Sequence, residues 1–257
     1  MPYTGANGIQ IYYESFGEAN EGASPIVLIH GSTITGKIDW GRIAPRLAEK
    51  FRVFVPDCRG HGKSEGTLTY SFRELADDTA SFIRKMGYEQ AHVIGHSNGG
   101  NVALVTLVEH PEVTKTAVLQ AANAFVTPYL IDREPVVMAP DYYARNNPGE
   151  VQMMIDAHGP THGADYWRKL LKMTMKEIIS EPNYTPQILS IVDRPTFVIM
   201  GAEDKVNAPD RHAQFIADNI PGAELWIPEK TGHNVHMEHP EEWIARVLDF
   251  LQRRGQE

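Results

Sequence analysis

Ser97 lies at the centre of a Gly-His-Ser-Asn-Gly pentapeptide at residues 95–99, directly after the apolar pair Val93-Ile94, which is read as the end of a short strand. A tight turn here would force its central residue into a strained backbone conformation, and the flanking glycines remove the clashes that side chains would cause. The serine hydroxyl would then project from the end of a strand, and the helix that follows would favour developing negative charge at its N-terminus. The pattern is typical of a nucleophilic serine at a strand–turn–helix junction.

A carboxylate and a histidine follow later in the chain, each after a predicted strand. Asp204 lies in the polar turn behind the apolar run of residues 198–200, with Glu203 beside it as an alternative acid. His233 comes after a second predicted strand, residues 223–227. A serine, a histidine and a carboxylate are the groups that nucleophilic acyl transfer requires.

Two further loops complete the pattern. The apolar run of residues 25–29 leads into His30-Gly31-Ser32, and the run of residues 52–55 leads into the segment DCRGHGKS at residues 57–64. With the Ser–Asp–His chain order, these motifs make the chain similar to the α/β-hydrolase superfamily, of the single-domain esterase, perhydrolase and C–C hydrolase type. The resemblance extends from about residue 9 to residue 250.

The resemblance implies roles for individual residues. Ser97 would be the nucleophile, His233 the general base and Asp204 the acid, since Asp204 fits the G-x-x-D pattern of the family. The backbone N–H groups of Ser32 and Asn98 would form the oxyanion hole. This chemistry requires no metal and no organic cofactor.

The expected fold is a single α/β domain over residues 1–257, with a mostly parallel central sheet and helices on both faces. Residues 9–15 alternate like an edge strand, and helices are predicted near residues 40–50, 71–86, 98–110, 211–219 and 240–253. Residues from about 125 to 190 interrupt the alternation of strands and helices. In the family an insert at this point forms a lid, and a helical lid is expected here.

The composition of the chain indicates which classes of partner and which cellular compartment to expect. The net charge of −9 argues against nucleic acid and anionic membranes as partners. Cys58 is the single cysteine, which excludes an intrachain disulfide and fits a reducing compartment. No signal peptide and no apolar run of 18 residues is visible, so a cytoplasmic protein is expected, as a monomer or a homodimer.

Two histidine groups resemble metal-ligand spacings. His233, His236 and His239 recur every third residue, but their segment reads as a loop and His233 is assigned to the triad. His158 and His162 flank a Gly-Pro pair that would break a helix, so they are interpreted as a turn of the lid. No metal site is predicted.

The substrate is predicted to be a small, mostly apolar carboxylic ester or a lactone, cleaved through an acyl-enzyme. A cofactor-free perhydrolase or a C–C bond hydrolase with the same triad is the alternative, and an aminopeptidase-like acyl hydrolase or a ligand-binding receptor on the same scaffold is a further one. The candidate pocket residues are aromatic or aliphatic and lie in the oxyanion loop, in the lid or beside the histidine: Trp40, Phe125, Tyr129, Met138, Tyr142, Trp167 and Val235.

Overall fold

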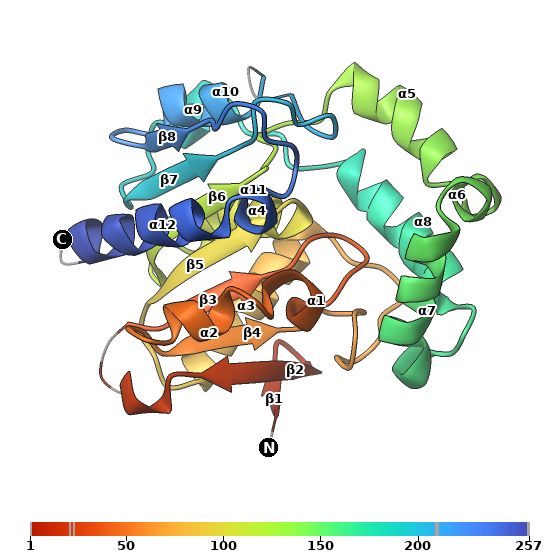
Figure 1. Ribbon diagram of the computed structural model, residues 1–257, viewed down its shortest axis with the longest axis horizontal. Coiled ribbons are helices and arrows are strands. Elements are labelled where there is room, and N and C mark those ends of the chain that lie inside the picture. The colour runs from red at the N-terminus through yellow and green to blue at the C-terminus, as the bar shows by residue number, and fades with distance from the viewer. Residues whose placement is uncertain (1, 21, 23, 209–210, 256–257) are drawn as a thin grey trace.

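A twisted sheet forms the centre of the molecule. The computed structural model describes residues 2–255 apart from residues 21, 23, 209 and 210, and within them eight strands lie in the order β1-β2-β4-β3-β5-β6-β7-β8 (Figure 1). β2 pairs antiparallel with β1 and β4, and the strands from β4 to β8 run parallel. The strands are β1 (Tyr3–Ala6), β2 (Ile9–Phe16), β3 (Ile26–Ile29), β4 (Val53–Pro56), β5 (Ala91–His96), β6 (Thr114–Gln120), β7 (Thr196–Ile199) and β8 (Glu224–Trp226).

Helices cover both faces of this sheet, which explains why β3 and β4 are apolar at every position. In β3, Ile26 and Leu28 pack with α1, α2 and α12 on one face, and Val27 and Ile29 pack with α3, α4 and α10 on the other. These helices are α1 (Gly36–Trp40), α2 (Ala44–Leu47), α3 (Phe72–Lys85), α4 (Asn98–Glu109), α10 (Ala213–Asn219) and α12 (Pro240–Arg254).

The strand order places a crevice at the C-terminal ends of β3 and β5. These strands are neighbours, yet β3 leads to α1 on one face of the sheet and β5 leads to α4 on the other. Loops that diverge in this way leave open space between them, which is where open α/β sheets bind ligands. Ser32 follows β3 and Ser97 follows β5, so both lie at this crevice.

Two expectations about individual elements were wrong. The helix expected over residues 40–50 is broken, because α1 ends at Trp40 with Gly41 as its C-cap and the four-residue α2 follows. The strand expected at the sheet edge, β2, is covered by β1 through the register Tyr3↔Tyr12 to Ala6↔Ile9. The helices expected near residues 71–86, 98–110, 211–219 and 240–253 are all present, as α3, α4, α10 and α12.

A helical insert separates β6 from β7 and packs beyond the C-terminal ends of the strands (Figure 1, green). It contains α5 (Pro128–Val137), α6 (Pro140–Asn146), α7 (Pro148–His162) and α8 (Tyr166–Ile178). The short α9 (Pro186–Leu189) that follows them lies beside α10 instead. Met138, Met154, Trp167 and Leu171 form a small core within the insert. Of the helices in the described residues, none is both long and apolar enough to cross a membrane.

Candidate active site

Ser97 occupies a sharp turn between β5 and α4. Its backbone torsions are φ 55° and ψ −119°, a conformation that costs a non-glycine residue about 1–3 kcal/mol. A Cβ atom on Gly95 would lie 1.9 Å from the carbonyl oxygen of Gly99, and one on Gly99 would lie 2.2 Å from that of Ile29. Only glycine therefore fits at either position. The turn is anchored by the N–H of Ser97, which donates to the carbonyl of Gln120 over 2.9 Å.

Asp204 and His233 are hydrogen bonded to each other. His233 Nδ1 lies 2.8 Å from Asp204 Oδ2, and Asp204 Oδ1 accepts hydrogen bonds from the N–H groups of Val206 and Asn207 over 2.8 and 3.0 Å. Burial opposes ionisation of Asp204, but the bond to His233 and the two backbone N–H groups lower its pKa below the ordinary value. The arrangement fixes the imidazole with Nδ1 toward the carboxylate.

The elements at this edge of the sheet bring the histidine loop close to the elbow. The ring of His96, the residue before Ser97, lies 5.1 Å from the ring of His233 between centroids. Ser32, Ser97 and Asn98 line one cavity of about 450 Å³, and Asn207 from the Asp204 loop also lines it. The structure therefore brings Ser32, Ser97 and Asn98 to one cavity and places His233, with its partner Asp204, next to the residue that precedes Ser97.

The cavity is more polar than the sequence suggested. Its far wall comes from the helical insert, through residues of α5, α6, α7 and α8. Six asparagines are among the described residues that line it, namely Asn98, Asn101, Asn123, Asn146, Asn147 and Asn207. The side-chain Oδ1 of Asn123 is buried and has no hydrogen-bond partner in the described part of the chain. An unpaired buried amide is costly, so this atom is a candidate contact for a ligand or water.

The predicted pocket residues divide into two groups. Met138 and Tyr142 line the cavity beside Ser97. The other five do not. Trp40 and Val235 lie in the core between the sheet and α1, α2 and α12, and Trp167 lies in the core of the insert. Phe125 packs on the rings of His212 and Phe215. Tyr129 lines an adjacent depression with Asp204. Of these five, Trp40, Trp167 and Val235 are buried, whereas Tyr129 is exposed outside the cavity.

Polar residues of the cavity were missed because asparagine is common in loops. One signal was available: Asn98 and Asn101 are three residues apart at the start of α4 and so share a helix face. Arg133 and Glu134, which the sequence offered as possible lid contacts for a carboxylate and for a free amine, form an ion pair that lines the cavity. Burial raises the pKa of Glu134, and the adjacent Arg133 opposes that shift.

His158 fastens the insert to the loops around the crevice. Contrary to the expected turn, α7 continues through Gly159 and Pro160, which lie in its last turn, and His158 is fully buried. Its Nδ1 accepts a hydrogen bond from the N–H of Gly62 over 2.8 Å, and its Nε2 donates to the carbonyl of Thr33 over 2.8 Å. Only a neutral ring can make both contacts.

Protonation of His158 would therefore loosen the insert. Burial lowers its pKa to about 4, and the nearby His30 and His162 rings act in the same direction, against the bond to Thr33. An unfolded histidine has a pKa of about 6.5. Because the folded value is the lower one, this contribution to stability is complete above about pH 6.5 and is lost as the pH falls toward 4.

Comparison with known proteins identifies the fold family of the chain. The family model described as the alpha/beta hydrolase fold matches residues 24–176, which contain the predicted nucleophile and oxyanion loops. The chain belongs to the α/β-hydrolase fold family.

Characterised relatives of this α/β-hydrolase match almost all of its length. It is 26% identical to the mouse serine hydrolase BPHL over 259 residues, which cover 96% of this chain and 84% of the relative. It is 28% identical to the 2-hydroxy-6-oxo-6-(2'-aminophenyl)hexa-2,4-dienoic acid hydrolase of Metapseudomonas resinovorans, over 98% of this chain and 91% of that enzyme.

Solved structures share its fold. The enol-lactonase of Burkholderia xenovorans LB400 superposes with a TM-score of 0.79 at 22% identity, covering 98% of this chain and all of the other. Est816, described as an N-acyl homoserine lactone degrading enzyme, superposes with a TM-score of 0.75 at 27% identity, over 97% of this chain and all of Est816. The names of these relatives and structures refer to different substrates, so the fold alone does not identify the substrate.

Proposed function

We propose that this α/β-hydrolase cleaves a carboxylic ester or lactone through an acyl-enzyme on Ser97. The observation that carries the proposal is the hydrogen bond between His233 and Asp204, set beside a serine held at positive φ. In the proposed reaction Ser97 Oγ attacks the carbonyl carbon, and His233 Nε2 takes the hydroxyl proton and returns it to the leaving oxygen. Water activated by the same nitrogen then releases the acid.

The other residues in the proposed reaction stabilise the charges that develop on His233 and on the substrate oxygen. Asp204 holds His233 in the tautomer that leaves Nε2 free to accept a proton, and it stabilises the imidazolium that forms. The N–H groups of Ser32 and Asn98 are proposed to bind the oxyanion; in other enzymes the loss of one such donor costs about 3–4 kcal/mol. The helical insert acts as a lid in this proposal, because it supplies the far wall of the cavity.

The lining of the cavity favours a substrate with hydrogen-bonding groups near the reacting carbonyl. Asparagine side chains from α4, from the loop after β6 and from the insert present amide groups to the cavity. Four of these side chains, those of Asn98, Asn101, Asn146 and Asn207, already hydrogen bond within the protein. The atom that an apolar acyl chain would leave unpaired is the buried Oδ1 of Asn123, at a cost in binding free energy. Polar esters and lactones of hydroxy acids or amides therefore fit better than the mostly apolar ester inferred from the sequence.

A C–C bond hydrolase is the second candidate, favoured by the 28% identity to the dienoic acid hydrolase from Metapseudomonas resinovorans. The named substrate of that relative is an acid, and an arginine in the cavity is the group expected to bind such a carboxylate. Arg133 lines the cavity, but its guanidinium is paired with the buried Glu134. The pair has no net charge, which favours a neutral ester or lactone over an anionic dienoate.

The proposal is tested by p-nitrophenol release from acetate, butyrate and octanoate esters, with wild type compared to Ser97→Ala. Labelling by a fluorophosphonate, mapped by mass spectrometry, shows which side chain reacts. We expect turnover that disappears in the variant and a label on Ser97. A folded wild type that neither turns over an ester or lactone nor takes the label would refute the serine hydrolase. Assays with hydrogen peroxide and with a dienoate separate perhydrolase and C–C activity.

A further inference from the structure

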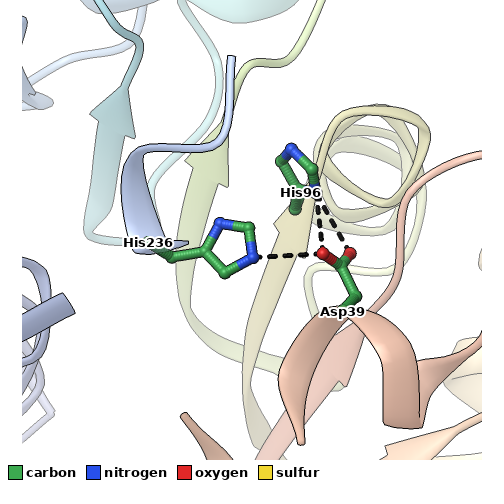
Figure 2. A group of neighbouring side chains, drawn as sticks. All are labelled: Asp39, His96 and His236. Carbon is green, nitrogen blue, oxygen red and sulfur yellow. Dashed lines mark hydrogen bonds and ion pairs between the residues drawn. The ribbon is translucent and has the colours of Figure 1, made fainter. Parts of the chain in front are cut away.

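A buried carboxylate joins three segments of the candidate active site. Asp39 lies in α1, and its side chain is completely buried. Its oxygens lie 3.0 and 3.1 Å from His96 Nδ1, and Oδ1 lies 3.1 Å from His236 Nε2, as Figure 2 shows. Oδ2 also accepts the N–H of Gly31 over 2.8 Å. Every partner of this carboxylate is an N–H donor.

The hydrogen bonds fix the proton on each ring. Gln120 Nε2 lies 2.7 Å from His236 Nδ1, which therefore accepts, so the ring proton of His236 is on Nε2 and points to Asp39. His96 must likewise carry its proton on Nδ1 to donate to the carboxylate. Burial opposes ionisation of Asp39, yet the two histidines lower its pKa below the ordinary value. The cluster is one carboxylate held by three N–H donors.

Each donor is attached to a different part of the proposed machinery. Gly31 directly precedes Ser32 of the oxyanion loop, and His96 directly precedes Ser97. His236 lies three residues after His233, in α11 (Val235–Glu238). The three segments come from the loops after β3, β5 and β8, which are far apart in the sequence. Trp40, next to Asp39, packs its ring 4.6 Å from that of His236 and closes the cluster from one side.

We propose that Asp39 is a positioning residue that holds the oxyanion loop, the nucleophile and the histidine loop in register with one another. The proposal rests on the serine hydrolase function proposed above. Hydrogen bonds to a charged acceptor are stronger than neutral ones, and a buried network of this kind has few alternative arrangements. Small displacements of reacting groups lower rates steeply, by about 100-fold for 1 Å.

The ligand atoms of Asp39, His96 and His236 lie within 4.8 Å of one another, which is a spacing that a metal ion could also use. The hydrogen bonds explain the spacing without one. Both ring nitrogens of His236 are engaged, and both oxygens of Asp39 already accept N–H donors. A metal ion bound between these groups would have to displace the ring proton that His236 donates to Asp39, which the hydrogen bond from Gln120 keeps on Nε2.

The Asp39→Asn variant removes the negative charge of the side chain while keeping its size, so it tests whether the charge is needed for positioning. The amide has one acceptor oxygen, so its NH2 group must face either the N–H of Gly31 or the Nε2–H of His236. A matched control is Asp78→Asn. Asp78 is also buried, and it accepts bonds from Arg59 Nε over 2.8 Å, from Arg59 Nη2 over 2.6 Å and from Asn7 Nδ2 over 2.8 Å, outside the candidate active site.

The measurements are steady-state kinetics with an ester, the rate of fluorophosphonate labelling, and hydrogen–deuterium exchange. For Asp39→Asn we expect kcat and the labelling rate to fall about 10- to 100-fold, with KM changed less than about twofold because the cavity wall is intact. Exchange should rise in the peptides that contain Gly31, Ser97 and His233. Asp78→Asn should lower the melting temperature but keep kcat and exchange in these peptides near wild type.

The outcomes separate this proposal from the function on which it rests. If the wild type hydrolyses no ester, the proposed function fails, and exchange at the three segments still reports whether Asp39 holds them together. If Asp39→Asn matches Asp78→Asn in kcat, labelling rate and exchange, Asp39 is an ordinary buried carboxylate and the positioning role is wrong. A rise in KM alone would also overturn it, since that result would place Asp39 in substrate binding.

Discussion

Replacement of Asp204 by asparagine should abolish most of the activity without unfolding the protein. The carboxylate accepts two backbone N–H bonds on Oδ1, from Val206 and Asn207, and the His233 bond on Oδ2. The backbone donors will select the amide oxygen for their side, so the NH2 group must face His233 Nδ1. That contact requires the other tautomer, with a proton on Nε2, and the ring can no longer accept the serine proton.

The expected loss in kcat/KM is about 10³- to 10⁴-fold, which corresponds to about 4–5.5 kcal/mol of transition-state stabilisation. The assay is p-nitrophenyl ester hydrolysis, with circular dichroism to show that the variant is folded. Glu203→Gln is the matched control, because Glu203 is the adjacent, exposed carboxylate. It should change kcat/KM less than about twofold. If Glu203→Gln lost the activity and Asp204→Asn retained it, the assignment of the acid would be wrong.

Three other perturbations follow from the structure. The free energy of unfolding of Ser97→Gly, measured by urea titration, should be about 1 kcal/mol higher than that of Ser97→Ala, because glycine adopts φ 55° without strain. Asn123→Leu should lower kcat/KM for p-nitrophenyl 3-hydroxybutyrate at least about fivefold more than for the butyrate, since it removes an amide from the cavity; equal losses would contradict a polar subsite. Wild type should lose about 3 kcal/mol more stability than His158→Asn between pH 6.5 and 4, measured by urea unfolding at each pH, because only wild type must protonate the ring; parallel pH curves would show that His158 does not contribute.

The parts of the site predicted from the sequence are those fixed by local chain geometry. Ser97 required glycines on both sides, and Gly95 and Gly99 are placed where a Cβ would strike the backbone. Asp204 and His233 could be located because each follows an apolar run that forms a strand, and parallel strands end at one edge of the sheet. The sheet and four of the five expected helices followed from the same patterns of apolar residues.

The parts that were not predicted depend on contacts between distant segments. Asp39 meets His96 and His236 across 57 and 197 residues of sequence, and no local pattern reports such a pairing. Trp40 was assigned to the pocket because it follows the oxyanion loop, but α1 is only five residues long and turns its last side chain into the core. His158 was assigned to a turn because Gly159 and Pro160 disfavour helix, and its buried contacts with Gly62 and Thr33 outweigh that preference.

Specificity in this architecture is expected to reside in the insert rather than in the sheet. The elbow and the Asp204 and His233 loops are constrained by close backbone approaches and buried charges, so few substitutions are compatible with them. The part of the cavity wall formed by α6 and α7 is less constrained, because Asn146 and Glu150 are exposed at its rim. In the proposed function, a polar wall beside Ser97 would therefore select among carbonyl compounds by the hydrogen bonds that each can return, and changes in the insert would alter that choice without altering the chemistry at Ser97.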